Sequence, residues 1–161
     1  MTFMDLLPLF TWLDTSFLAE ISKSYGGVFA VVQMFHLLAM AVLGGVVILG
    51  DLRLLGVLMT DIPTAKVLRP TYRAFDIALF ALVLTGIFMS SAVAMKLFYN
   101  EMYWVKMIAL LVGVLFVYAI RRPLLGNDPD TLRPISRTLI ALSSLVTWFT
   151  VAASGRWIGF S

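Results

Sequence analysis

The chain's only histidine, His36, stands inside a long apolar stretch, where an imidazole can do chemistry. A neutral imidazole can ligate a haem iron or another metal, relay a proton, or hydrogen-bond to a neighbouring helix. Gln33 precedes His36 by about one helical turn and Met40 follows it by about one, so a helix would place the three side chains on nearly one face. The spacing therefore predicts a polar site around His36, and all three roles remain open.

Haem and copper are the two cofactors that these residues suggest. His36 is a candidate axial ligand of a b-type haem, and because the chain has one histidine, bis-histidine ligation would require a second subunit. The nine methionines suggest copper(I) as an alternative, since thioethers select soft metal ions. Methionine is also an ordinary filler of apolar helices, and Met40 is the one methionine close to His36 on its face. Copper therefore ranks below haem b.

Charged residues form a second group near the far end of the same apolar stretch and at the start of the next. Asp51 and Arg53 are two residues apart, so in a helix they point to different sides, and each needs a partner on another helix. We expect Asp51 to pair with Arg73 and Arg53 with Asp76, although Arg73 and Asp76 are also close enough in sequence to pair locally. Such a network would be a clamp that holds the fold together or part of an ion or proton path.

A third polar group comes from the opposite ends of the later apolar stretches and consists of Asn100, Glu101, Lys106 and Arg156. Lys106 and Arg156 would extend to lipid headgroups if they snorkel. The alternative is a basic pocket that receives an anionic ligand or a quinone headgroup.

The elements that must position these residues are membrane helices. The chain is 61% hydrophobic and 13% charged, whereas a soluble domain is about half apolar and about a quarter charged. Apolar stretches long enough to cross a bilayer predict four spans, at residues 28–50, 75–94, 103–120 and 137–155, and the first helix can extend to about residue 59. Residues 60–71 should form a loop because Pro63 and Pro70 break helices. Residues 95–101 should form a short connection.

An amphipathic helix is expected before the first span, over residues 11–23, lying in the membrane interface. The predicted fold is therefore an all-α, integral membrane four-helix bundle with an N-terminal interfacial helix, in one domain over residues 1–161. Basic residues favour the cytoplasmic side of short loops. Eight of them flank the first and third connections (Arg53, Lys66, Arg69, Arg73, Arg121, Arg122, Arg133 and Arg137), against four on the other side (Lys23, Lys96, Lys106 and Arg156). Both termini are therefore expected outside the cytoplasm, in the periplasm.

Several motifs resemble a known family. They are MFHLLAMAVLGG around His36, GDLRLLG at 50–56, LTGIFMSSA at 84–92, Tyr99-Asn100 with Lys106, and AASGRWIGF at 152–160. Together they resemble an uncharacterised family of small bacterial inner-membrane proteins, known as a domain of unknown function. The resemblance implies a helical bundle in the bacterial inner membrane and implies no activity.

The remaining sequence narrows the function without naming it. There is no cysteine, no H-E-x-x-H, no G-x-S-x-G and no phosphate-binding glycine loop, so no catalytic motif supports an enzyme. The net charge of +3 fits topology and lipid contact and gives no reason to expect a nucleic-acid partner. Small residues four apart, Ala41 with Gly45 and Gly155 with Gly159, favour close helix contacts in a homo-oligomer or larger complex. Three hypotheses follow: a haem-binding electron-transfer subunit, a small transporter or proton-linked channel, and a structural accessory subunit without chemistry.

Overall fold

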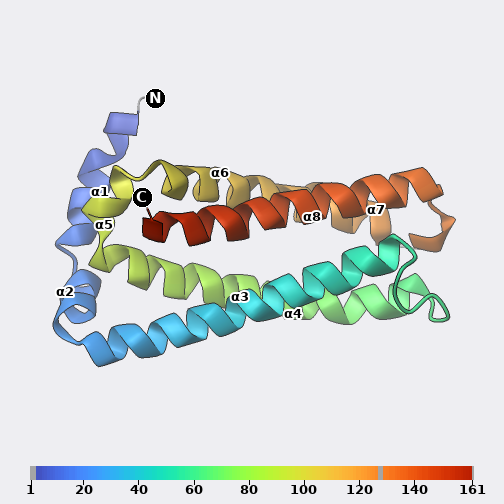
Figure 1. Cartoon of the computed structure of the whole chain (residues 1–161), viewed down its shortest axis with the longest axis horizontal. Coiled ribbons are helices and arrows are strands. Elements are labelled where there is room, and N and C mark those ends of the chain that lie inside the picture. Colours follow the sequence, from blue (N-terminus) through green and yellow to red (C-terminus); the bar gives the residue numbers. More distant parts are fainter. Residues whose placement is uncertain (1–2, 127–128, 161) are drawn as a thin grey trace.

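A computed structural model describes residues 3–126 and 129–160 as a bundle of helices (Figure 1). Four helical segments are long and apolar enough to span a membrane, which confirms the predicted all-α fold with four spans. They are α3 (Gly26–Leu54), α4 (Thr64–Ala92), a third segment formed by α6 (Glu101–Leu115), the π-helix η2 (Phe116–Arg121) and α7 (Arg122–Leu125), and α8 (Pro134–Trp157) with its 3-10 extension η4 (Ile158–Phe160).

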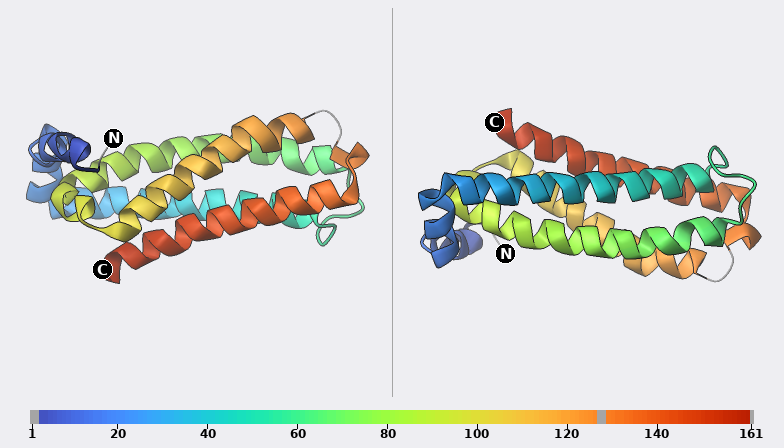
Figure 2. Two further views of the ribbon diagram at one scale, coloured as in Figure 1. Left: turned by 90° about the horizontal axis from the view of Figure 1, so that it is seen from above. Right: turned by 90° about the horizontal axis from the view of Figure 1, so that it is seen from below.

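The four segments form two antiparallel pairs. Helix α3 packs along α4, α6 packs along α8, and α3 joins the pairs by packing on α8. Both chain ends lie at one end of the bundle, as an even number of spans requires (Figures 1 and 2). We call this the terminal end, and we call the opposite end, where the chain connects α3 to α4 and α7 to α8, the loop end.

The outer surface of the bundle is apolar along most of its length. Large side chains such as Ile77, Phe80 and Phe149 are each more than 65% exposed, which fits contact with lipid chains. On α4 the exposed residues change from Lys66, Arg69 and Arg73 to Ile77 and Phe80 as the helix runs away from the loop end. This change from basic to apolar surface marks a headgroup boundary at the loop end.

The interior is layered. One apolar cluster lies in the middle of the bundle and contains Leu43, Val47, Phe75, Ala78, Val117 and Trp148. A second cluster lies nearer the loop end and contains Leu54, Leu68, Leu125, Ile140 and Ala141. A third closes the terminal end and contains Phe10, Ala94, Leu97 and Phe98. Buried polar side chains therefore stand between layers of tightly packed apolar ones.

The expected interfacial helix at 11–23 is two short helices, α1 (Leu7–Asp14) and α2 (Phe17–Ser24). Ser16 separates them because its hydroxyl accepts a hydrogen bond from Ala19 N and so caps the start of α2. Both helices lie across the terminal end (Figure 1). Phe10 is buried there against the rings of Phe98 and Trp104, while Trp12 and Phe17 are exposed.

Three helix boundaries differ from the prediction. Helix α3 ends at Leu54 and not near residue 59, because Gly56 takes the positive φ of 73° that terminates helices. The prediction of a loop over residues 60–71 is wrong from Thr64 onward, because α4 begins at Thr64 and continues through Pro70. Val67 and Leu68 are buried, so their packing outweighs the hydrogen bond that Pro70 lacks. The connection at 95–101 contains a short helix, α5 (Ala94–Phe98).

Candidate functional site

The most deeply buried charges are Asp51 near the end of α3 and Arg121 at the end of η2. Arg121 Nη2 lies 2.7 Å from Asp51 Oδ1, and the two side chains are 6% and 0% exposed. Arg121 Nη1 also donates to Ser144 Oγ of α8 at 3.2 Å. Three helical segments thus meet at one polar centre, which we call the buried ion pair, between two apolar clusters.

The π-helix explains why two neighbouring arginines reach different partners. Successive residues of a helix point about 100° apart, so Arg121 faces the interior and Arg122 faces the side of α4. A π-turn shifts the register of the residues that follow it and is frequent at functional sites. Sequence reasoning treated both arginines only as basic residues that end a span. Both arginines directly follow an apolar run, and this position in the sequence could have indicated that they pair with Asp51 and Asp76.

The buried ion pair leaves much of its hydrogen-bonding capacity unused. Arg121 Nη2 lies close to Asp51 Oδ1 without the alignment of a hydrogen bond, and the Ser144 hydroxyl is the other polar neighbour of the Asp51 carboxylate. Three further buried atoms have no hydrogen-bond partner among the described residues: Arg121 Nε, Tyr72 Oη and Trp148 Nε1. Buried polar atoms normally have partners, so unpartnered donors around a buried carboxylate are suited to hydrogen-bond with water.

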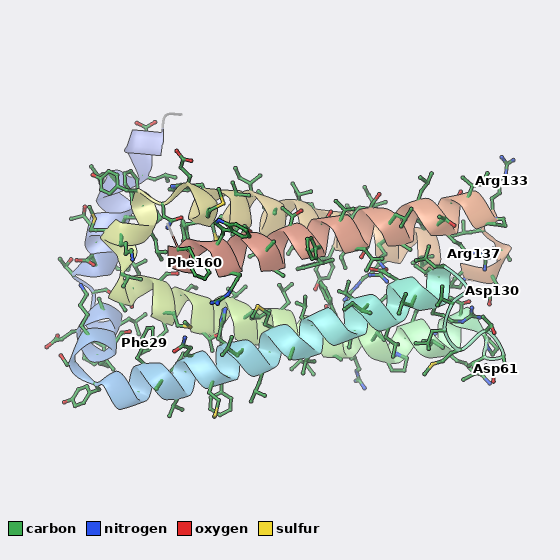
Figure 3. The ribbon with its side chains drawn as sticks, in the orientation of Figure 1. Phe29, Asp61, Asp130, Arg133, Arg137 and Phe160 are labelled. Carbon is green, nitrogen blue, oxygen red and sulfur yellow. The ribbon has the colours of Figure 1, made fainter. Side chains whose placement is uncertain are left out.

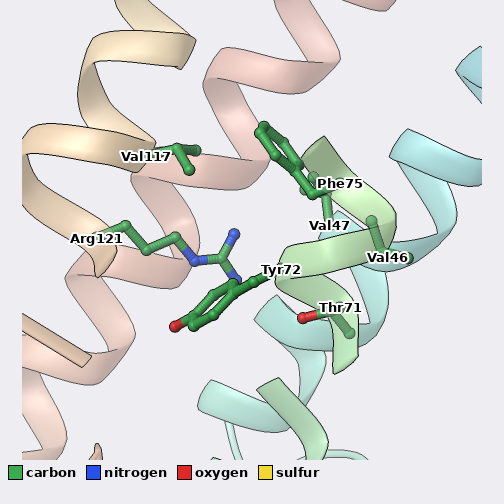
Figure 4. Close-up of a pocket in the computed structure, with 7 residues that line it drawn as sticks. All are labelled: Val46, Val47, Thr71, Tyr72, Phe75, Val117 and Arg121. Atoms are coloured by element: carbon green, nitrogen blue, oxygen red, sulfur yellow. The ribbon is translucent and has the colours of Figure 1, made fainter. Parts of the chain in front are cut away.

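A small pocket adjoins this centre, and Figure 4 shows the Arg121 guanidinium and the Tyr72 ring at its edge. It lies between α3, α4 and η2. Its lining consists of Val46, Val47, Thr71, Tyr72, Phe75, Val117 and Arg121.

The neighbouring pair of Asp76 and Arg122 is different in kind. Both Asp76 oxygens accept hydrogen bonds from Arg122, at 2.5 and 3.2 Å, and Tyr118 donates a third at 2.5 Å. The guanidinium also lies 4.4 Å from the centre of the Tyr118 ring. The Asp76 side chain is 44% exposed. This bidentate pair, in which both oxygens of an accessible carboxylate are hydrogen-bonded, has the features of a structural clamp.

The predicted pairings of Asp51 with Arg73 and of Arg53 with Asp76 are wrong. The structure pairs Asp51 with Arg121 and Asp76 with Arg122, while Arg73 is exposed on α4. Arg53 instead donates to the carbonyl of Ile62 at 2.7 Å and so holds the connection after α3. The four residues therefore do not form one network, because α3 and α4 both turn their acidic side chains toward the third span.

Asp130 caps the start of α4 at the loop end, where Figure 3 labels it near Arg137. Its carboxylate accepts hydrogen bonds from Thr64 Oγ1 at 2.5 Å and Thr64 N at 3.1 Å. Pro63, the residue before α4, offers no side-chain cap. The Thr64 hydroxyl is the main cause that lowers the pKa of Asp130, and the Thr64 N–H and the charges of Arg53 and Arg137 act in the same direction.

His36 points from α3 toward α4, and its Nδ1 lies 2.7 Å from Thr85 Oγ1. The Thr85 hydroxyl lies 2.6 Å from the carbonyl of Ala81 and donates its one proton there. Nδ1 must then donate to Thr85, which leaves Nε2 as a hydrogen-bond acceptor. Gln33 and Met40, which the sequence placed with His36, are both exposed. The structure therefore replaces them with Thr85 as the neighbour of the imidazole.

The four residues expected to form a pocket at the terminal end differ in their surroundings, and the pocket itself stays a prediction. Asn100 caps α6 by accepting a hydrogen bond from Tyr103 N. Glu101 is exposed, and exposed Arg156 lies over the Phe160 ring at 4.8 Å. Asn100 is buried and also donates to the carbonyl of Ile158, and Lys106 is half-buried with its stem beside Gly155 of α8. In the half of the bundle next to this end, His36 and Thr85 form a hydrogen-bonded pair between α3 and α4.

Comparison with known proteins gives a family and no activity. A family described as a family of unknown function, DUF6644, matches residues 9–161. No curated protein and no solved structure matches the chain. Within residues 3–126 and 129–160, no group of three or more histidine, cysteine or acidic side chains is arranged to hold a metal ion.

Proposed function

The chain belongs to the DUF6644 family, and we propose that it is a small membrane transporter or channel that moves protons, alone or with a solute, through its helical bundle. Its four apolar helices fit a membrane protein, and its function rests on the ionisable groups inside them. Ionisable side chains are costly within a membrane and are functional candidates there.

One observation carries the proposal: the carboxylate of Asp51 is fully buried and is paired with Arg121 without the alignment of a hydrogen bond. A pair that served only to hold helices together would gain from satisfied, bidentate contacts, as Asp76 and Arg122 do. Asp51 has a counter-charge that stabilises its ionised form and free oxygen lone pairs that can receive a proton. That combination suits a group that alternates between two protonation states.

Protonation of Asp51 would remove the charge that holds Arg121. Arg121 already donates to Ser144, so its guanidinium has a second partner when the carboxylate becomes neutral. The π-helix that carries Arg121 is a backbone element able to accommodate such a shift. The pair is therefore proposed to act as a two-state element whose position depends on one proton.

His36 is the proposed second proton-binding group on this path. It lies in the half of the bundle next to the terminal end, and its Nε2 accepts a proton. The central apolar cluster, with Phe75 and Trp148, separates it from Asp51. Transport therefore requires this layer to open transiently, so it is the proposed barrier to a continuous leak.

The test is proton flux into vesicles. Purified protein is reconstituted into liposomes that contain a pH-sensitive dye, and an outward potassium gradient with valinomycin provides the driving force. We expect the internal pH to fall faster than in protein-free vesicles. Equal rates across a range of external pH values, with correctly folded protein in the membrane, would contradict the proposal.

A haem-binding role is a second candidate, and it is favoured by the same hydrogen bond at His36. Metal-bound histidines commonly donate one ring nitrogen to a fixed acceptor and ligate through the other, as Nδ1 donating to Thr85 would allow here. Absorption spectra of protein purified with haem supplied test it. A Soret band that disappears in His36→Ala would support haem ligation, and a colourless protein would leave His36 as a proton-binding or hydrogen-bonded residue.

Self-association and location are proposed with the function. Ala41 and Gly45 are both exposed on α3, and a Cβ added to Gly45 would meet nothing within 4 Å. Two small residues one turn apart on a lipid-facing surface suit contact between copies of the chain. We propose a homo-oligomer in a bacterial inner membrane, with the terminal end periplasmic because basic residues concentrate at the loop end. Cross-linking of cysteines placed at Ala41 in native membranes tests the contact.

A further inference from the structure

The first turns of α4 carry three basic residues on the side of the helix that points away from the bundle. Lys66, Arg69 and Arg73 are all exposed, and intervals of three and four residues place them along one side of the helix. The opposite side of α4 packs into the bundle through buried residues such as Leu68 and Phe75. We call the three exposed cations the basic face.

The charges of the basic face are not neutralised from within the described part of the chain, where none of the three cations forms an ion pair. Asp76 is close to Arg73 in sequence, but its two oxygens accept hydrogen bonds from Arg122 and Tyr118. Like charges one helical turn apart repel one another. An anion that lies on the basic face would therefore be attracted by all three cations and would reduce their mutual repulsion.

The same side of α4 becomes apolar directly after Arg73. Ile77, Phe80 and Leu84 follow at intervals of four, three and four residues, and all three are exposed. In a membrane, such residues contact the lipid chains. A phospholipid has the same order of groups, with a charged phosphate above apolar chains. Free phosphate or an acidic protein segment would match only the basic part of this surface.

The connection between α3 and α4 independently favours a lipid surface next to the basic face. Val57, Leu58 and Met59 are exposed although they lie outside the spanning helices, and so is Ile62, two residues before α4 begins. Apolar side chains next to basic ones are the composition with which interfacial segments bind anionic membranes. The connection therefore fits a position of the basic face at the level of the lipid headgroups.

We propose that the basic face of α4 binds the phosphate of an anionic phospholipid whose acyl chains lie along Ile77 and Phe80. A lipid with a net negative headgroup, such as phosphatidylglycerol, should be preferred over phosphatidylcholine, because the choline group would bring a further positive charge close to the three cations. The basic face shares no residue with the proposed proton path, so lipid binding and proton flux can succeed or fail separately.

The test counts the lipids that stay bound to the protein. Native mass spectrometry is applied to the full chain in detergent micelles that contain equal amounts of phosphatidylglycerol and phosphatidylcholine, whose masses differ. We expect bound phosphatidylglycerol to exceed bound phosphatidylcholine by at least about fivefold, the preference that one fully effective basic residue gives at an anionic surface. Equal binding of the two lipids by the native protein would overturn the proposal.

Added salts separate a lipid from a free anion as the occupant. Sodium phosphate and sodium chloride at equal ionic strength should reduce the bound phosphatidylglycerol to the same extent, because both only screen charges. If sodium phosphate displaced the lipid while sodium chloride did not, the basic face would be a site for the free anion and the proposal would fail.

A triple variant with Lys66→Gln, Arg69→Gln and Arg73→Gln should bring the ratio of the two bound lipids close to one. Because all three side chains are exposed, the variant should keep the native helix content, which circular dichroism checks. An unchanged ratio in the folded triple variant would overturn the proposal. The comparison of the two lipids on the native protein decides the matter even if that variant does not fold.

The matched control removes the same number of exposed positive charges at the terminal end, with Lys23→Gln, Lys96→Gln and Arg156→Gln. Both triple variants have the same net charge, so a general attraction between the protein and anionic lipid would fall equally in both. We expect the control to keep the native preference for phosphatidylglycerol. An equal loss of preference in the two variants would contradict a site on α4.

Discussion

Gly50 gives Arg121 the room it needs to reach Asp51. A Cβ on Gly50 would lie 2.8 Å from Arg121 Nη2, closer than Cβ atoms approach other atoms in proteins, and 3.2 Å from Leu68 Cδ2, which is tighter than most Cβ contacts. The glycine comes one residue before Asp51 and lies under the guanidinium that pairs with it. The small side chain and the buried charge are therefore two parts of one arrangement.

Gly50→Ala should weaken the buried ion pair, because the added methyl group occupies the position of the guanidinium. Overpacking of this kind costs about 1–3 kcal/mol. Gly44→Ala is the matched control on the same helix, since its Cβ would meet nothing within 4 Å. Unfolding in mixed micelles should show a loss for Gly50→Ala and no loss for Gly44→Ala. Equal stability of the two variants would mean that Arg121 does not need the space.

Asp51→Leu should be strongly destabilising because it leaves Arg121 buried without a counter-charge, at a cost on the order of 3–5 kcal/mol. Removing both charges, as Asp51→Leu with Arg121→Leu, should recover part of that loss. The same cycle on Asp76 and Arg122 should give a smaller coupling, about 0–1 kcal/mol, because Asp76 is 44% exposed. Free energies of unfolding of the four variants in each cycle give the coupling. Additive effects in the first cycle would show that Asp51 and Arg121 do not interact.

Asp130 should make stability depend on pH at the loop end. Its pKa in the folded protein lies below the ordinary value of 3.8, mainly because the Thr64 hydroxyl donates to it. The folded state therefore gains from ionised Asp130 at every pH above 3.8, and this gain disappears as the pH falls through the lowered pKa. Asp130→Asn keeps one acceptor oxygen but removes the charge, so it should lose about 1 kcal/mol at pH 7, the difference between a hydrogen bond to a charged acceptor and one to a neutral acceptor. Native and variant stabilities should converge in acid, and a constant difference down to pH 2 would refute this role.

The orientation rests on the distribution of basic residues, and reporter fusions test it. A fusion after Ser161 should report the periplasm, and one inserted after Asn127 should report the cytoplasm. Both positions lie outside the residues that the structure describes, and neither carries a proposed role. The opposite pattern would place His36 nearer the cytoplasm and the buried ion pair nearer the periplasm.

The spans were predictable because a bilayer imposes a local requirement: a segment such as Gly26–Leu54 must be apolar over the part that crosses the hydrocarbon core. Predictions from local sequence failed where contacts with residues far away in the chain determine the structure. Pro70 looked like a helix breaker, yet Asp130 caps the start of α4 and the packing of Leu68 maintains it. A partner for Asp51 could be expected from the cost of a buried charge. Its identity as Arg121 depends on how the π-helix turns that side chain, which no local pattern reveals.

The most direct test of the central claim compares proton flux through Asp51→Asn and Asp76→Asn in the same liposome assay. Both substitutions remove one carboxylate that pairs with one of two adjacent arginines, and both keep nearly the same shape. If Asp51 carries the proton, Asp51→Asn should fall to the rate of protein-free vesicles while Asp76→Asn conducts like the native protein. Native-like flux through folded Asp51→Asn would contradict the account.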